Sequence, residues 1–374
     1  MADKKKNASV RTDFTVSSIS EIIRRNALEN PTRASYMYMK GSVDMHANHE
    51  AIKNVVDAAR VGLEMLGMEG SRVAVVGDKS VELVACYLAA MCVPGSAVYI
   101  DPALEPEVQR AQINEAKCEC VVFTRGSRSN YIGHQSELPK VRFFIQVDTN
   151  AKFIEQSGNR DDVLPESTNL DYATFIKYGF ALHNIGKASA MPAPKPDKEC
   201  AVFFDDEGNM TTMTQREFFD KLNEIHAAVE YSGEDLFVSV QRLGNINEMF
   251  YGILAPLMAG ASVAFGDNGK NSVRDIKKYR PDVLHVTVDM LNSIYDAMKV
   301  QATKDGGEGK FEKKIEFVLK LKKFHIDLSK KQFANEMALI GGRVKKMVCV
   351  ANGAEVNEKM LADFDAMGIK VIIR

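Results

Sequence analysis

The sequence predicts an α/β fold of two lobes, each with a mostly parallel sheet covered by helices. Short apolar runs alternate with longer segments in which apolar residues recur every three or four positions, a pattern typical of strands joined by helices. The chain has 374 residues, of which 45% are hydrophobic. This length exceeds one average core and predicts two or three packed lobes or one large α/β unit.

The first half of the chain shows the alternation clearly. A helix is expected at 20–30, where Pro31 ends it, and a second helix at 46–67, where Ile52, Val56 and Leu63 share one face. From residue 72 onward, strands and helices alternate. The expected strands are 72–77, 97–100, 120–123 and 142–147, with helices at 80–92 and 105–116.

A polar stretch at 157–170 and a proline-rich stretch at 191–196 predict a junction near 185–197. The expected organisation is therefore a disordered basic tail at 1–15, a first lobe at 16–190 and a second lobe at 197–374. The second lobe repeats the pattern. Its expected strands are 201–204, 236–240, 261–265, 283–286, 346–350 and 369–373. Its expected helices are 215–231, 246–259, 272–279, 288–300 and 355–367. Two more helices are expected within 311–340, and a loop is expected at 301–310.

Charge and cysteine usage exclude several classes of protein. The formal net charge is -2, which gives no electrostatic reason to expect nucleic acid or an anionic membrane as a partner. The six cysteines are scattered and form no repeated CxxC pairs, so we expect buried, reduced thiols and a cytoplasmic protein. The most apolar segment, 81–100, is interrupted by Glu82, Pro94 and Gly95, so we expect core rather than a transmembrane segment.

Several segments occur in a specific order and spacing along the chain: 22–31, 34–36, 72–82, 95–102, 250–263, 280–284, 341–344 and 352–354. This order resembles that of the adenylate-forming (AMP-binding) enzymes, most of all the long-chain acyl-CoA synthetases. Asn352, Gly353 and Ala354 stand where that family has a Gly-Gly-Ala turn against the adenine. The resemblance runs from about residue 16 to the end and implies the fold of the large N-terminal domain of those enzymes.

The resemblance implies a two-step ligase reaction, in which a carboxylate attacks the α-phosphate of ATP and a thiol then displaces AMP.

The family holds the triphosphate with a loop of small hydroxyl residues and glycine that ends in Pro-Lys-Gly. This chain has no lysine there. The matching positions are Asp205, Asp206, Glu207, Gly208 and Asn209. Backbone N–H groups and a cation are what a phosphate site needs, so three carboxylates make this a degenerate loop. A divalent metal is one alternative for these acids, and a tight hairpin turn is the favoured one.

Two further departures from the family concern the pocket and the end of the sequence. Asn245 stands in place of a histidine that lines the acyl pocket, and a helix cap is its favoured role. With Asn352, Gly353 and Ala354 it forms the expected remnant of an acyl and adenine pocket. The family's Tyr-Gly-x-Thr-Glu motif is expected after strand 369–373, where the sequence reaches Arg374. Hence no catalytic residue, ribose-binding aspartate or C-terminal lysine domain can be assigned.

Three other features are favoured as structural rather than functional. His46 and His49 lie three apart on an expected helix, but no third metal ligand is near them. Cys118 and Cys120 are expected to pack rather than to bind zinc. The basic run at 313–323 is expected to be a solvated helix face rather than a membrane contact. No metal site is therefore expected.

These observations lead to three hypotheses. The first is a catalytically inactive, acyl-CoA synthetase-like pseudoenzyme that needs no cofactor and binds a partner protein, or an acyl or nucleotide ligand. The alternative is part of an active long-chain fatty acid-CoA ligase that is completed by another chain and uses ATP, Mg²⁺ and CoA. The third is a scaffold subunit that pairs with an intact paralogue and regulates it.

Overall fold

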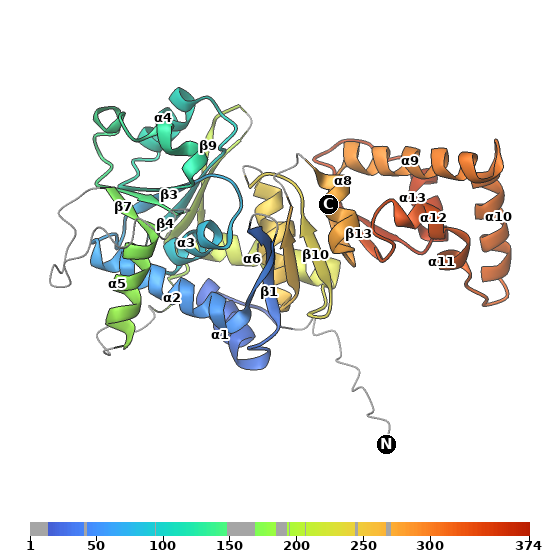
Figure 1. Ribbon diagram of the computed structural model, residues 1–374, viewed down its shortest axis with the longest axis horizontal. Helices are drawn as coiled ribbons and strands as arrows, with labels where there is room; N and C mark the ends of the chain where they lie inside the picture. The colour runs from blue at the N-terminus through green and yellow to red at the C-terminus, as the bar shows by residue number, and fades with distance from the viewer. Residues whose placement is uncertain are drawn as a thin grey trace, which may run out of the picture. The chain divides into compact units, whose positions relative to one another are not determined.

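The structure is a computed structural model in which the chain forms two compact units (Figure 1). The first unit comprises Asp13–Glu224 with Arg242–Ile246, and the second comprises Ile225–Gln241 with Asn247–Arg374. The tail predicted at 1–15 lies outside the described residues except for its last two positions. The described residues are 14–40, 43–93, 95–147, 169–184, 193, 195–205, 207–243, 246–266 and 271–374.

The first unit is built on a seven-stranded sheet of order β7-β6-β5-β3-β4-β8-β9. Every neighbouring pair is parallel except β8 and β9, which are antiparallel. The four expected strands of the first lobe are all present, because each is an apolar run buried on both faces. The strands are β3 (Arg72–Val76), β4 (Ser96–Ile100), β5 (Cys120–Phe123), β6 (Phe143–Gln146), β7 (Asn169–Asp171), β8 (Glu199–Phe204) and β9 (Met210–Thr214).

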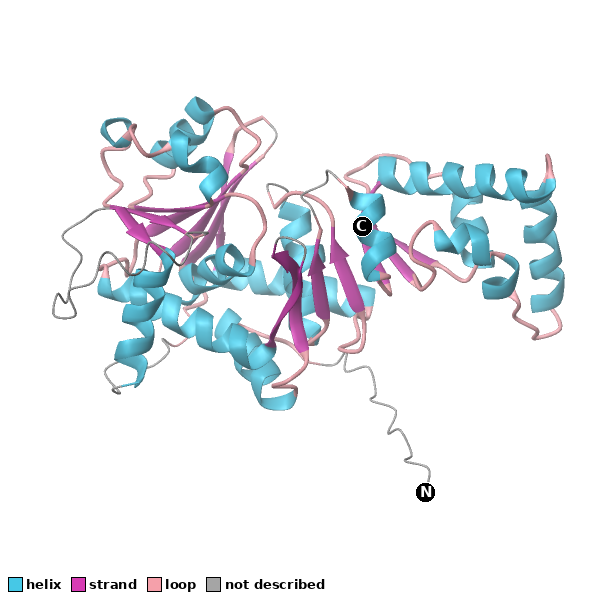
Figure 2. Ribbon diagram, in the orientation of Figure 1, coloured by secondary structure: helices cyan, strands magenta, loops and turns pink. Residues whose placement is uncertain are grey.

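Helices cover both faces of this sheet (Figure 2). On one face, Tyr87 of α3 meets Tyr99 of β4 edge to face, with ring centroids 5.8 Å apart. On the other face, Ile113 of α4 and Tyr131 pack on the core strands, and Cys118 is buried in the same cluster. The α-helices of this unit are α1 (Ile19–Glu29), α2 (His49–Met65), α3 (Val81–Cys92), α4 (Pro106–Glu115) and α5 (Tyr172–Asn184), and α6 (Gln215–Val229) begins in it.

An antiparallel pair of strands near the N-terminus was not predicted. Strand β1 (Ala34–Lys40) pairs with β2 (Val43–Asn48). The helix expected from residue 46 therefore begins at His49, because the Asn48 side chain accepts the N–H of Ala51 at 2.8 Å and caps the helix there. His46 lies on a strand and not on the same helix as His49, so the helical spacing proposed for these two histidines is wrong.

The second unit holds five parallel strands in the order β14-β13-β12-β10-β11. All five were expected as strands of the second lobe. The expected strand at 201–204 is different: it forms β8, which pairs in parallel with β4 and so belongs to the sheet of the first unit. The strands of the second unit are β10 (Leu236–Ser239), β11 (Ser262–Phe265), β12 (Val283–Thr287), β13 (Lys346–Val350) and β14 (Lys370–Ile373).

The helices of the second unit follow the prediction in order but differ in three places. Helix α9 continues to Gly306, so most of the loop expected at 301–310 is helical. The helix expected at 246–259 is π-helical over Glu248–Leu254 and α-helical after it as α7. Within 311–340, where two helices were expected, the second is divided into α11 and α12. The basic run at 313–323 lies on α10, whose buried side includes Phe311 and Val318. The α-helices are α7 (Ala255–Ala259), α8 (Ser272–Tyr279), α9 (Val288–Gly306), α10 (Lys310–Lys322), α11 (Ser329–Gln332), α12 (Ala334–Ala338) and α13 (Glu358–Ala366).

Candidate functional site

The turn at the degenerate phosphate-loop positions joins β8 to β9. Phe204 pairs with Met210 at the ends of the two strands, and the backbone N–H of Asp205 donates to the carbonyl of Asn209 at 3.1 Å. The N–H of Gly208 donates to the carbonyl of Asp205 at 3.0 Å, and Gly208 adopts a φ of 87° that favours glycine. The interpretation of this segment as a hairpin turn is thus confirmed. Asp206 lies outside the described residues.

The side chain of Asp205 is fully used inside this turn. Its Oδ1 accepts the backbone N–H of Asn209 at 2.7 Å, and its Oδ2 accepts the Asn209 side-chain amide at 2.9 Å. These hydrogen bonds hold the pKa of Asp205 below its usual range, so the carboxylate is ionised at neutral pH. Glu207 is exposed beside it. The turn is therefore an anionic surface in which the N–H groups of Asp205, Gly208 and Asn209 already have acceptors.

The second predicted segment lies at the carboxyl end of β13. Asn352 and Gly353 have φ values of 47° and 85°, and the N–H of Ala354 donates to the carbonyl of Ala351 at 2.9 Å. All three predicted residues are exposed. The carboxyl ends of parallel strands are where open α/β sheets bind ligands, so this turn is placed where an adenine contact is expected. Asn245 lies outside the described residues.

A buried polar cluster in the second unit lies next to the same strand ends and was not predicted. Glu248 is 0% exposed, and its Oε2 lies 2.8 Å from Nδ1 of His285 on β12. Because a carboxylate only accepts, this contact assigns the proton to Nδ1 when the imidazole is neutral. The hydroxyl of Ser239, at the end of β10, donates to the other carboxylate oxygen. The three side chains thus connect two neighbouring strands to the π-helical segment.

The surroundings of this cluster fix it in place. The ring of Tyr251 stacks on His285 with centroids 5.5 Å apart. At Gly252, a Cβ would lie 2.6 Å from the carboxyl carbon of Glu248. Glycine is therefore required there, and the π-helical turn brings it against the carboxylate. Single π-helical turns within helices are often found at functional sites.

No protein-family profile and no curated protein matches the sequence, but solved structures match the fold. The adenylation domain of a carboxylate reductase from Mycobacterium chelonae superposes with a TM-score of 0.71 at 12% identity, covering 97% of this chain and 58% of that one. The corresponding domain from Segniliparus rugosus, solved with AMP and a co-purified carboxylic acid, gives 0.70 at 14% identity, covering 95% and 59%. A protein described as a long-chain-fatty-acid CoA ligase of Rhodopseudomonas palustris gives 0.65 at 14% identity, covering 96% and 74%.

The chain has the fold of an adenylation domain. The fold predicted from the resemblance to adenylate-forming enzymes is therefore confirmed. The chain spans less than three fifths of the length of the two carboxylate reductase domains. Identities this low establish the adenylation fold alone, so any activity must be argued from the residues of this chain.

Two further features bear on what this adenylation fold can hold. Among the described residues, no group of three His, Cys, Asp or Glu side chains is placed to bind a metal. Asp205, which was one of the acids considered for a divalent ion, has both oxygens engaged by Asn209. In the same part of the chain, no helix has the length and apolar composition needed to cross a membrane.

The Glu248 cluster had a weak signal in the sequence. Glu248 is the one acid in the otherwise apolar run 248–259, and His285 interrupts the apolar strand 283–286. Buried carboxylates need hydrogen-bond partners, so each residue alone indicates a hidden contact. Their pairing was not predictable, because 37 positions separate them.

Proposed function

We propose that this chain is a non-catalytic binding or regulatory module with the adenylation fold, and that it does not activate carboxylates with ATP. One observation carries the proposal. The backbone N–H groups of Asp205, Gly208 and Asn209 donate to acceptors inside the turn, and the acceptor for Asn209 is the Asp205 carboxylate. A phosphate cradle needs the opposite arrangement, with free N–H groups and a nearby cation.

A triphosphate at this turn meets two carboxylates. Asp205 and Glu207 repel it, and 205–213 contains no lysine or arginine to offset them. Both side chains are exposed, so water and salt screen the repulsion, and its direction is to weaken ATP binding. On this proposal the chain uses no ATP, Mg²⁺ or CoA.

The adenine side of the fold is not opposed in the same way. The turn Asn352–Ala354 carries no charged side chain, and its three residues are exposed. One solved neighbour binds AMP and a carboxylic acid, which is a property of that protein. For this chain, we expect only that the fold binds a ligand without a triphosphate, or a partner protein.

Carboxylate-dependent exchange of labelled pyrophosphate into ATP tests this proposal. The chain is assayed alone, and again after isolation from its own cells with the proteins that co-purify, over a panel of fatty and aromatic acids. A carboxylate reductase adenylation domain serves as the positive control. We expect exchange at the no-enzyme background from the chain alone. Exchange above that background with any acid would defeat the proposal. Exchange that requires a co-purifying chain would support the alternative of a ligase completed by a second chain.

A further inference from the structure

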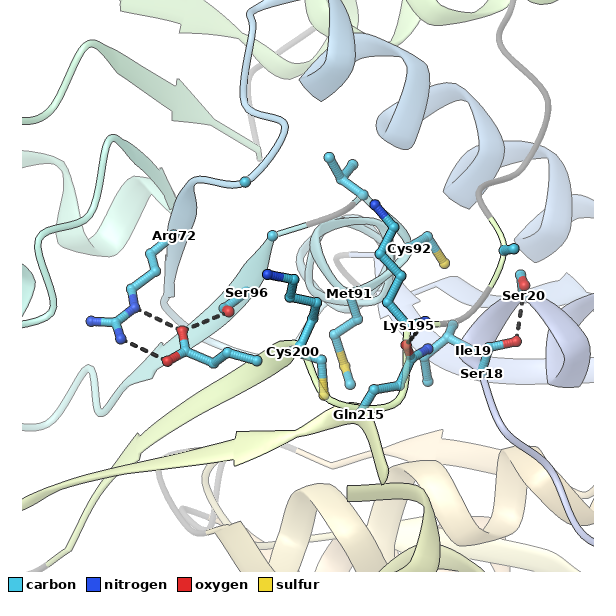
Figure 3. Close-up of a pocket in the computed structure, with 16 residues that line it drawn as sticks. Ser18, Ile19, Ser20, Arg72, Met91, Cys92, Ser96, Lys195, Cys200 and Gln215 are labelled. Atoms are coloured by element: carbon cyan, nitrogen blue, oxygen red, sulfur yellow. Dashed lines mark hydrogen bonds and ion pairs between the residues drawn. The ribbon is translucent and has the colours of Figure 1, made fainter. Parts of the chain in front are cut away.

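A cavity of about 430 Å³ lies within the first unit, at the edge of the sheet where the strands begin. Its walls come from the starts of three neighbouring strands, from the end of α3 and from the start of α1. This edge is opposite to the carboxyl ends at which the turn after β8 lies, so the cavity is separate from the degenerate phosphate loop. Figure 3 shows the Arg72 and Ser96 side of the cavity facing the side formed by Lys195, Gln215 and Ser18.

Among the described residues that line the cavity, the one carboxylate is already neutralised. Glu199 at the start of β8 accepts two hydrogen bonds from Arg72, both at 2.7 Å, and a third from the hydroxyl of Ser96 at 2.7 Å. Burial raises the pKa of Glu199, but these hydrogen bonds outweigh it, and the pKa lies below its usual range. The carboxylate is therefore fixed on the guanidinium and is not positioned to neutralise other cations.

Two further cations line the cavity without a counter-ion. Lys195 and Lys198 are exposed, and neither ammonium forms an ion pair with any residue that the structure describes. Gln215 holds the backbone at this point, because its side-chain oxygen accepts the N–H of Lys195 at 2.7 Å. Because Glu199 balances Arg72, the lining that the structure describes carries an excess of positive charge.

The floor of the cavity is apolar. It is formed by Met91 and Val93 at the end of α3, by Ile19 of α1 and by Cys200 of β8, and Cys92 lies beside them (Figure 3). Burial raises the pKa of both thiols to about 12, so they are neutral at physiological pH and count as apolar surface. The lysine ammoniums beside this sulfur-rich apolar floor are complementary to a molecule with one anionic end.

We propose that this cavity binds a small amphiphile, with its carboxylate or phosphate head near Lys195 and Lys198 and its apolar body on the floor formed by Met91 and Cys200. The volume falls within the range of small-molecule sites. At about 30 Å³ per water-sized group it holds a ligand of roughly a dozen non-hydrogen atoms. Lysine ammoniums act as point charges that accept either head group. The site does not involve the turn at residue 205 and does not depend on the proposed loss of ATP chemistry.

Calorimetric titration of the full chain with octanoate and octyl phosphate tests this inference and distinguishes the two head groups. We expect at least one of them to bind with a submillimolar Kd. Octanol, which lacks the charge, and acetate or inorganic phosphate, which lack the apolar body, are expected to bind at least tenfold more weakly. The K195Q/K198Q variant is expected to lose at least fivefold in affinity, whereas K140Q, at an exposed lysine of the same unit, is expected to bind normally.

Methyl NMR of the methionines gives a second readout that does not depend on activity, with the Met91 signal assigned from M91L. Octanoate or octyl phosphate is expected to shift the Met91 resonance, and K195Q/K198Q is expected to need more ligand for the same shift. The inference is wrong if neither amphiphile binds with a Kd below about 1 mM. It is also wrong if K195Q/K198Q binds as well as K140Q, or if Met91 remains unperturbed at saturation.

Discussion

Removing the buried carboxylate of the second unit by E248A is expected to cause a large loss of stability. The side chain is 0% exposed and accepts from both Ser239 and His285. Hydrogen bonds to charged groups contribute about 1.5 to 3 kcal/mol each, so the loss of both should cost about 3 to 6 kcal/mol. At roughly 2 to 4 °C per kcal/mol, the midpoint of thermal unfolding should fall by about 10 °C.

Thermal unfolding followed by far-ultraviolet circular dichroism is the assay, because the chain has no tryptophan to report on this unit. E316A is the matched control, since Glu316 is exposed on α10 of the same unit, and it should change stability by no more than about 0.5 kcal/mol. A double-mutant cycle with H285A should show a coupling of about 1 to 3 kcal/mol. If E248A melts within about 2 °C of E316A, or if E248A and H285A are additive, the cluster does not hold the strands as described.

Two further variants test contacts on which the account depends. G252A would place a Cβ 2.6 Å from the carboxyl carbon of Glu248 and should lower the free energy of unfolding, measured by urea titration, by about 1 to 3 kcal/mol. G126A is the control, because a Cβ there has nothing within 4 Å, and it should not lower stability. Equal urea midpoints for the two variants would contradict the packing around Glu248. Burial raises the pKa of Glu199, but hydrogen bonds from Arg72 outweigh it and hold the pKa below its usual range. Glu199 therefore stabilises the fold at pH values above its unfolded pKa of about 4.3. This contribution is lost as the pH falls through the lowered pKa of the folded state. Wild-type protein should therefore lose stability more steeply than E199Q below about pH 4, and parallel pH profiles would argue against the ion pair.

The sequence was most informative where physical causes are local. Strands such as β3 and β5 are short apolar runs, and Ser80 caps the helix that was expected to begin there. Gly208 marked the hairpin turn correctly, because only a tight turn favours its conformation. These elements could be predicted because each depends on a few consecutive residues.

What could not be predicted depends on partners distant in the chain. The β1–β2 pair was missed because the burial pattern of β2 does not alternate, and most of its residues are exposed. The placement of β8 beside β4 brings together residues about 100 positions apart. The contact of Glu248 with His285 likewise depends on the parallel pairing of β10 with β12. Propensity and periodicity carry no information about such pairings.

Thermal stabilisation by adenosine, AMP and ATP–Mg²⁺ tests the central claim most directly, because a ligand that binds the native state raises its stability in proportion to its affinity. We expect stabilisation to decrease as phosphates are added. D205N/E207Q, which removes charge but keeps a side-chain oxygen at each position, should strengthen ATP binding by about tenfold or more and leave adenosine unchanged. A clear shift of the wild-type midpoint by submillimolar ATP–Mg²⁺, larger than that given by AMP, would contradict the account.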